Sequence, residues 1–249
     1  AIALFLDKFL LSKSIPSARV LTFWTAIFNL LGVVFIFFNF NWAASWQTIL
    51  IASLSGITFA FALLFFYISM KGGEATHISP FVGGIAPVVS LFLSYVWLGE
   101  VLNGNQLIAV GLIVFGVFLI SFEKSKAHNG WHVGLLCGVI AGILFGASFV
   151  CLRAAYLQDN FVTGFVWARL GMLPAVLPFL FFRDVRESCR FRKKQKGKMK
   201  KGVFTLLAVN KICAALYAVG IDYAISLASA TLVNALAGLQ YASLFILVY

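Results

Sequence analysis

Long stretches of apolar residues, separated by short polar links, make up most of this chain. Several of them exceed the roughly 18–20 residues that an α-helix needs to cross the ~30 Å hydrocarbon core of a bilayer. The pattern therefore predicts an all-α, polytopic membrane protein. Its helices are expected at residues 1–11, 20–38, 47–70, 74–100, 106–122, 131–156, 161–182, 203–225 and 229–249.

The stretch 74–100 is the most distinctive of these segments, because it contains two prolines and a glycine pair and carries no charge between its two terminal glutamates. Such residues are tolerated in a membrane helix, where neighbouring helices and local adjustments satisfy the freed backbone groups. The stretch 229–249 repeats its shape, so that Gly83 aligns with Gly238. The chain is thus expected to consist of two related halves.

The polar segment 123–130 is the expected boundary between these halves. Residues 1–122 would form an N-terminal five-helix repeat and residues 131–249 a C-terminal one. The first helix is expected to be partial, and the tenth to lie beyond the chain. Within 131–156 a ridge of glycines at four-residue spacing is predicted to let other helices approach closely; its members are Gly134, Gly138, Gly142 and Gly146.

Composition supports the membrane assignment: 62% of the residues are hydrophobic and 11% charged, with 27 Phe, whereas soluble domains have about a quarter charged. The net charge of +11 is attributed to membrane topology rather than to nucleic-acid binding. Lys and Arg concentrate in the links after the first, third, fifth and seventh helices, which places those links in the cytoplasm. The largest group is the basic loop 183–202. Its run 183–201 is either a solvated topogenic loop or a site for anionic lipid headgroups.

Enzymatic and metal-binding motifs are absent from the sequence. It has no GxSxG, HExxH or Walker-type segment, and its cysteines form no CxxC pair. The sequence therefore predicts a protein that is not an enzyme and uses neither a metal nor another cofactor. The informative residues are instead the polar side chains within apolar segments, because their burial in hydrocarbon is costly.

Arg169 and Lys211 are the main candidates. Each lies eight residues inside its predicted helix, about 12 Å from opposite membrane faces, and no acidic residue is expected at the same depth. Two unpartnered cations would bind a carboxylate or phosphate of a small-molecule substrate; the alternative is that both snorkel or bond to backbone carbonyls. The substrate-binding residues are predicted to be Arg169, Lys211, Asn234, Gln240, Thr76, Ser79 and Tyr217.

Asp7 and Asp222 are the acidic residues nearest the hydrocarbon. Either could carry a coupling proton if it were buried, and the alternative is an interfacial carboxylate in contact with water. Asp222 projects from the same face of its helix as Lys211 but about 16 Å further along the axis. These two residues are therefore too far apart to pair with each other.

The residues 59–100, ending in Leu98-Gly99-Glu100, and the segment 216–240 together resemble the EamA-type transporters of the drug/metabolite transporter superfamily. The resemblance implies ten helices in two inverted five-helix repeats, located in the cell membrane. It also implies a secondary transporter, with export as the expected direction, that moves small polar or amphipathic metabolites by alternating access. The alternative is a non-transporting membrane scaffold or lipid-binding protein that uses the basic run 183–201.

Overall fold

The computed structural model of the chain describes residues 6, 7, 9, 11, 17–72, 75–121, 131–189 and 201–241. Over these residues the fold is entirely helical, without strands, as the sequence predicts. The predicted junction 123–130 lies outside the described residues, and so does most of the predicted first helix. The division into two repeats and the total of ten helices therefore stay predictions.

The described helices follow the predicted segments within a few residues. They are α2 (Ala18–Asn29) with its 3₁₀ continuation η2 (Leu30–Phe37), α3 (Trp46–Gly72), α4 (Ala75–Leu93) with a π-helical end η3 (Ser94–Leu98), α5 (Gly104–Ser121), α6 (Trp131–Gln158), α7 (Phe161–Val176) with a 3₁₀ end η4 (Leu177–Phe181), α8 (Arg183–Cys189), α9 (Lys201–Leu227) and α10 (Ala230–Ala237).

Six helical segments are long and apolar enough to cross a membrane, by length and composition. They are Ala18–Phe37, Trp46–Lys71, Ile78–Leu98, Gly134–Gln158, Phe161–Phe181 and Ala208–Leu227, and the segment Gly104–Val117 of α5 is a shorter apolar helix. The chain is therefore a multi-pass membrane protein.

Polar side chains define where several helices begin. Ser17, Asn160 and Ser229 precede α2, α7 and α10, and each side chain accepts a hydrogen bond from a backbone N–H in the first turn. Such N-caps satisfy donors that have no partner within the helix. At the other end of α4 and η3, Gly99 adopts a left-handed conformation with φ of 64°, which costs glycine little and ends the helix.

Close helix crossings depend on glycine. Gly56 of α3 and Gly171 of α7 face each other's helix, since a Cβ at Gly56 would collide with the α7 backbone and one at Gly171 with the backbone of Ser53. The glycine ridge of α6 packs mainly on α4, and Gly138 also approaches Ser69 of α3. The prediction that this ridge lets two neighbouring helices approach is confirmed.

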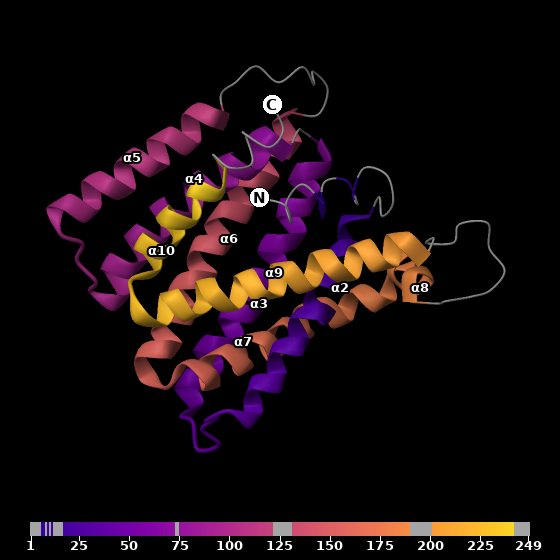
Figure 1. Cartoon of the computed structure of the whole chain (residues 1–249), viewed down its shortest axis with the longest axis horizontal. Helices are drawn as coiled ribbons and strands as arrows, with labels where there is room; N and C mark the ends of the chain where they lie inside the picture. Colours follow the sequence, from indigo (N-terminus) through magenta and orange to yellow (C-terminus); the bar gives the residue numbers. More distant parts are fainter. Residues whose placement is uncertain are drawn as a thin grey trace.

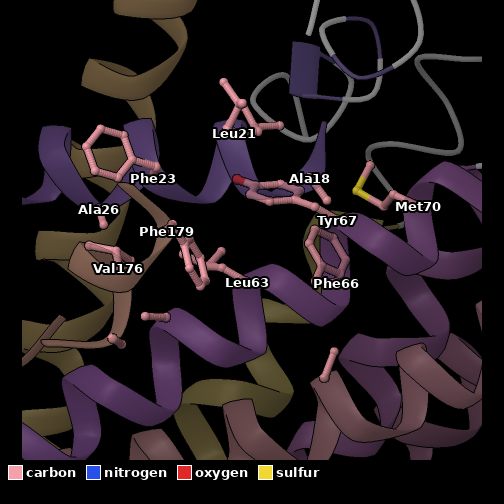
Figure 2. Close-up of a cluster of buried hydrophobic side chains, with 14 of the residues drawn as sticks. Ala18, Leu21, Phe23, Ala26, Leu63, Phe66, Tyr67, Met70, Val176 and Phe179 are labelled. Carbon is pink, nitrogen blue, oxygen red and sulfur yellow. The ribbon is translucent and has the colours of Figure 1, made fainter. Parts of the chain in front are cut away.

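The largest apolar core lies between α2, α3 and the α7 end, with Leu21, Leu63 and Phe179 among its members. Figure 2 shows this cluster, with Tyr67 lying beside Ala18 and Phe66. In Figure 1, α9 crosses the near side of the bundle with α7 close to it, and α10 lies alongside α4.

The segment after α7 differs from its prediction in one respect. Residues 183–189, expected to belong to a loop, form the short helix α8, in which Val185 is buried and Arg183 Nε lies 2.7 Å from Glu187 Oε1. Asp184 also accepts a hydrogen bond from Ser17 at 2.5 Å, so this helix is held against the start of α2. Residues 190–200 of the basic run lie outside the described part of the chain.

Candidate functional site

A cavity of about 510 Å³ lies among helices α2, α3, α4, α6, α7, α9 and α10. Two buried ion pairs contribute to its wall, Asp7–Lys211 and Arg169–Asp222. Lys211 and Asp222 both belong to α9 and are eleven residues apart. At 1.5 Å per residue the two pairs are therefore separated by about 16 Å along that helix, with the cavity between them.

The Asp7–Lys211 pair forms a dense polar network. Lys211 Nζ donates to Asp7 Oδ1 at 2.7 Å, and Asn210 Nδ2 donates to the same oxygen at 2.8 Å. The hydroxyl of Tyr67 donates to Asp7 Oδ2 at 3.2 Å and also accepts from Lys211 Nζ at 3.2 Å. Thr25 Oγ1 is 3.2 Å from the same hydroxyl. Both charges are thus satisfied by several partners, which a buried ion pair requires to be stable.

This network ties distant parts of the chain together. Asp7 lies before α2, Tyr67 near the end of α3, and Lys211 in the first half of α9. Only 2% of Lys211 and 6% of Asp7 is exposed. The network therefore excludes most solvent and fixes three segments at one end of the cavity.

The Arg169–Asp222 pair connects α7 to α9. Arg169 Nη2 donates to Asp222 Oδ2, and the guanidinium carbon lies 4.4 Å from the centre of the Phe165 ring. Both side chains are buried, at 7% and 6% exposed. Among the described residues this is the only hydrogen bond that Asp222 accepts, whereas Asp7 accepts three.

The wall between the two pairs is largely aromatic. Phe59 and Phe66 of α3 face Phe145 and Phe149 of α6, with ring centroids 5.4 Å to 6.2 Å apart between the two helices. Beside these rings, the hydroxyls of a serine pair on α3 and α6 exchange hydrogen bonds with each other's backbone carbonyls at 2.8 Å and 2.9 Å. The centre of the cavity thus favours an apolar group, and its ends favour charged ones.

The helix α4 meets the segment after α10 where Gly83 contacts the side chain of Tyr241. A Cβ at Gly83 would overlap the tyrosine ring, so the absence of a side chain there makes room for it. Both residues line the cavity. The two segments that the sequence pairs as similar in shape therefore lie against each other at its wall.

The expectation that Arg169 and Lys211 have no acidic partner is wrong. Arg169 pairs with Asp222, and Lys211 pairs with Asp7. The prediction for Arg169 was wrong because it compared membrane depths by Cα position alone and left out the length of the side chain. Helix α9 extends to Leu227, so Asp222 lies more than one turn inside the helix, and the long arginine side chain covers the remaining difference.

The two acidic residues that the sequence singles out are buried within the bundle and line the cavity. Asp7 and Asp222 are 6% and 4% exposed. Each is buried because a cation from another segment of the chain neutralises it.

The other predicted substrate-binding residues fall into three groups. Asn234, Gln240 and Tyr217 line the cavity, and Asn234 Nδ2 also donates to Ser90 Oγ at 3.4 Å. Ser79 is fully buried and does not contribute to the cavity wall. The side chain of Thr76 lies outside the described part of the chain.

Sequence reasoning did not identify the aromatic wall or the Ser55–Ser148 pair. The chain has 27 Phe, and nothing in their spacing separates those that face the cavity from those that face lipid. A serine in an apolar helix ordinarily bonds to its own backbone. Only the packing of α3 on α6 shows that Ser55 and Ser148 bond to each other's helix.

A third ion pair, half-buried, lies away from the cavity wall. Arg153 Nε donates to Glu100 Oε1 at 2.9 Å, and Arg153 Nη1 donates to the carbonyls of Ile225 and Ser226. It thereby bonds to carbonyls that the end of α9 leaves without intrahelical partners. Over the described ranges no cluster of three or more metal-ligating side chains is present.

Two comparisons with known proteins bear on this geometry. The model of the EamA-like transporter family matches residues 1–122. A comparison with curated proteins gave no match. The matched range contains Asp7, Tyr67 and Gly83, whereas Arg169, Lys211 and Asp222 lie beyond it.

Proposed function

Because the model of the EamA-like transporter family matches residues 1–122, we propose that this chain belongs to that family, within the drug/metabolite transporter superfamily, and is a secondary transporter in the cell membrane. Its substrates are small polar or amphipathic metabolites, and export is the proposed direction. The observation that supports this proposal is the cavity of about 510 Å³, which has an aromatic centre and a buried ion pair at each end. A volume of this order accommodates a small organic molecule.

We further propose that transport occurs by alternating access. The cavity wall combines residues from both predicted repeats, from α2, α3 and α4 of the first and from α6, α7, α9 and α10 of the second. In inverted-repeat transporters the substrate site lies near the midplane between the repeats. The packing of the proline-bearing α4 on α10, and of Gly83 on Tyr241 after α10, supports that location.

Coupling to protons is part of the same proposal. Asp7 and Asp222 are the acidic residues of the cavity wall, and a buried carboxylate that exchanges its partner during transport can take up or release a proton. In this model the substrate contacts Arg169, Lys211, Tyr217, Asn234 or Gln240. No cofactor and no catalytic step are required.

Reconstitution into proteoliposomes tests this function. The measurement is uptake and counterflow of a panel of labelled metabolites, with and without a pH gradient. We expect flux of at least one amphipathic class, stimulated by the gradient, and a loss of that flux in Arg169→Gln. Glu100→Gln is the matched control, because it removes a carboxylate from an arginine pair outside the cavity. The absence of flux across the whole panel would contradict the proposal.

A further inference from the structure

The two ion pairs of the cavity differ in how firmly their acidic partner is held. Asp7 accepts hydrogen bonds from Lys211, Asn210 and Tyr67 at 2.7 to 3.2 Å. Breaking the Asp7–Lys211 pair would leave several buried groups without partners, which costs far more than a single hydrogen bond. This end of the cavity is therefore fixed.

The Arg169–Asp222 pair is much less constrained. Among the described residues, Asp222 accepts one hydrogen bond, and Arg169 donates that one bond through Nη2. A guanidinium has five N–H donors in a planar fork that matches a carboxylate, and Arg169 lines the cavity. A carboxylate on a bound molecule can therefore take the place of Asp222 at this cation with little other rearrangement.

Charge determines what must happen to Asp222 when this exchange occurs. The cavity wall holds two cations and two carboxylates, and these compensate one another. A bound anion would add an uncompensated negative charge to a buried site, at a cost of several kcal/mol. The cost is avoided if the displaced Asp222 carboxylate takes up a proton from the aqueous side to which the cavity is open.

We propose that Arg169–Asp222 is an exchangeable pair, and that the transported molecule is an amphipathic monocarboxylate which binds Arg169 while Asp222 takes up one proton. This inference rests on the proposed transport function and assigns both its substrate class and its coupling residue. The apolar part of the substrate lies against the rings of Phe59, Phe145 and Phe149. The site returns to its starting state when the carboxylate leaves, Asp222 loses its proton and Arg169 pairs with it again.

The surroundings of Asp222 contain few other titratable groups. Arg169 faces it from α7, Tyr156 from α6 and Tyr217 from α9 itself. Tyrosine and arginine side chains ordinarily titrate far above physiological pH, whereas the reference pKa of a carboxyl lies below it and rises when burial disfavours the charge. Asp222 is therefore the group among these four that can change its protonation when a carboxylate binds.

Calorimetry of the purified full chain in detergent tests the exchange directly. The probes are phenylacetate, hexanoate and benzoate, each compared with its primary amide. Titration in two buffers of different ionisation enthalpy gives the number of protons taken up with each bound molecule. We expect about one proton per carboxylate for the unaltered protein, no uptake with the amides, and weaker binding of the amides.

Three variants separate the exchange from a general structural effect. Asp222→Asn removes the competing charge, so carboxylates should bind about tenfold more tightly and without proton uptake. Arg169→Gln combined with Asp222→Asn keeps the site neutral and removes its cation, so it should bind the amides more tightly than the carboxylates. Glu100→Gln, at the Arg153 pair outside the cavity, should behave like the unaltered protein in both respects.

The outcomes distinguish this inference from the proposed function. Failure of all three carboxylates to bind, binding without proton uptake, or proton uptake that persists in Asp222→Asn would each overturn the exchange. Flux of a different substrate class in proteoliposomes would then leave the transporter function intact. Carboxylate binding with proton uptake but without flux would support the exchange and contradict transport.

Discussion

Two ion pairs of the same chemical type lie about 16 Å apart along α9, yet their surroundings give them different roles. At one end, Asp7 and Lys211 are enclosed by Tyr67 and Asn210, and together they link three distant segments of the chain. At the other end, Arg169 and Asp222 join only α7 to α9. Burial alone does not distinguish the two, since all four residues are buried.

The number of hydrogen bonds to the carboxylate is what separates them. A buried charge with several donors resists both displacement and protonation, whereas a charge with one donor can exchange that donor for another partner. The difference teaches that an intramembrane ion pair cannot be assigned to function from its charges alone. Its neighbours decide whether it stabilises the fold or binds a ligand.

The largest effect is expected when the well-satisfied pair is broken. Lys211→Met leaves the Asp7 carboxylate buried without its cation, which should lower the stability of the folded protein by about 3–5 kcal/mol. The measurement is the midpoint of thermal unfolding in detergent. Combining it with Asp7→Asn removes the unpaired charge and should restore most of the loss. An unchanged midpoint in the single variant would show that this pair does not hold the fold.

A smaller loss of stability is expected from Arg169→Gln, about 2 kcal/mol, because Asp222 can take up a proton from the cavity when its single donor is lost. Transport should be affected more strongly by Arg169→Gln than by Lys211→Met. In Arg169→Gln, flux of a carboxylate should fall at least about tenfold. Thermal unfolding and proteoliposome uptake are measured on the same preparation. If Arg169→Gln destabilised the protein more than Lys211→Met and left flux intact, the division of roles would be reversed.

The sequence predicted the helical segments well but not the partners of the charged residues. Hydrophobic runs determine spans because each helix must satisfy its own backbone in the bilayer, so α3, α6 and α9 were predicted to within a few residues. Arg169 and Lys211 were correctly singled out as intramembrane cations. Their pairing with Asp222 and Asp7 could not be predicted, since it depends on which helices pack together and on the reach of long side chains.

The short helix α8 was missed for a similar reason, because contacts between distant residues are not visible in the sequence. The basic run was predicted as a loop because its charges dominate its composition, yet Arg183–Cys189 is helical and packs Val185 inward. A single buried valine among charged residues is too weak a signal of amphipathicity. The hydrogen bond from Ser17 to Asp184 that anchors this helix links residues far apart in the chain.

Removal of the Tyr67 hydroxyl tests how much the hydrogen bonds around Asp7 contribute to the stability of the folded protein. Tyr67→Phe deletes the hydrogen bond to Asp7 and the acceptor for Lys211, and should cost about 1.5–2 kcal/mol because both partners are charged. Tyr95→Phe is the matched control, since this tyrosine is 62% exposed, and it should cost less than about 0.5 kcal/mol. Equal shifts in unfolding midpoint for both would argue against a special role for the network.

The smallest effect concerns local opening of α9 near Lys211, at the end of the cavity that the Asp7 network holds. Hydrogen exchange of the backbone amides around Lys211 reports how often this part of α9 opens. Asp7→Asn weakens the bond to Lys211, and a local loss of about 1 kcal/mol should raise the exchange rate of these amides about fivefold. Asp222→Asn lies about 16 Å away and should leave the rate unchanged when no ligand is present. An equal increase in both variants would mean that the two ends of the cavity open as one unit, and the contrast between a fixed and an exchangeable pair would then fail.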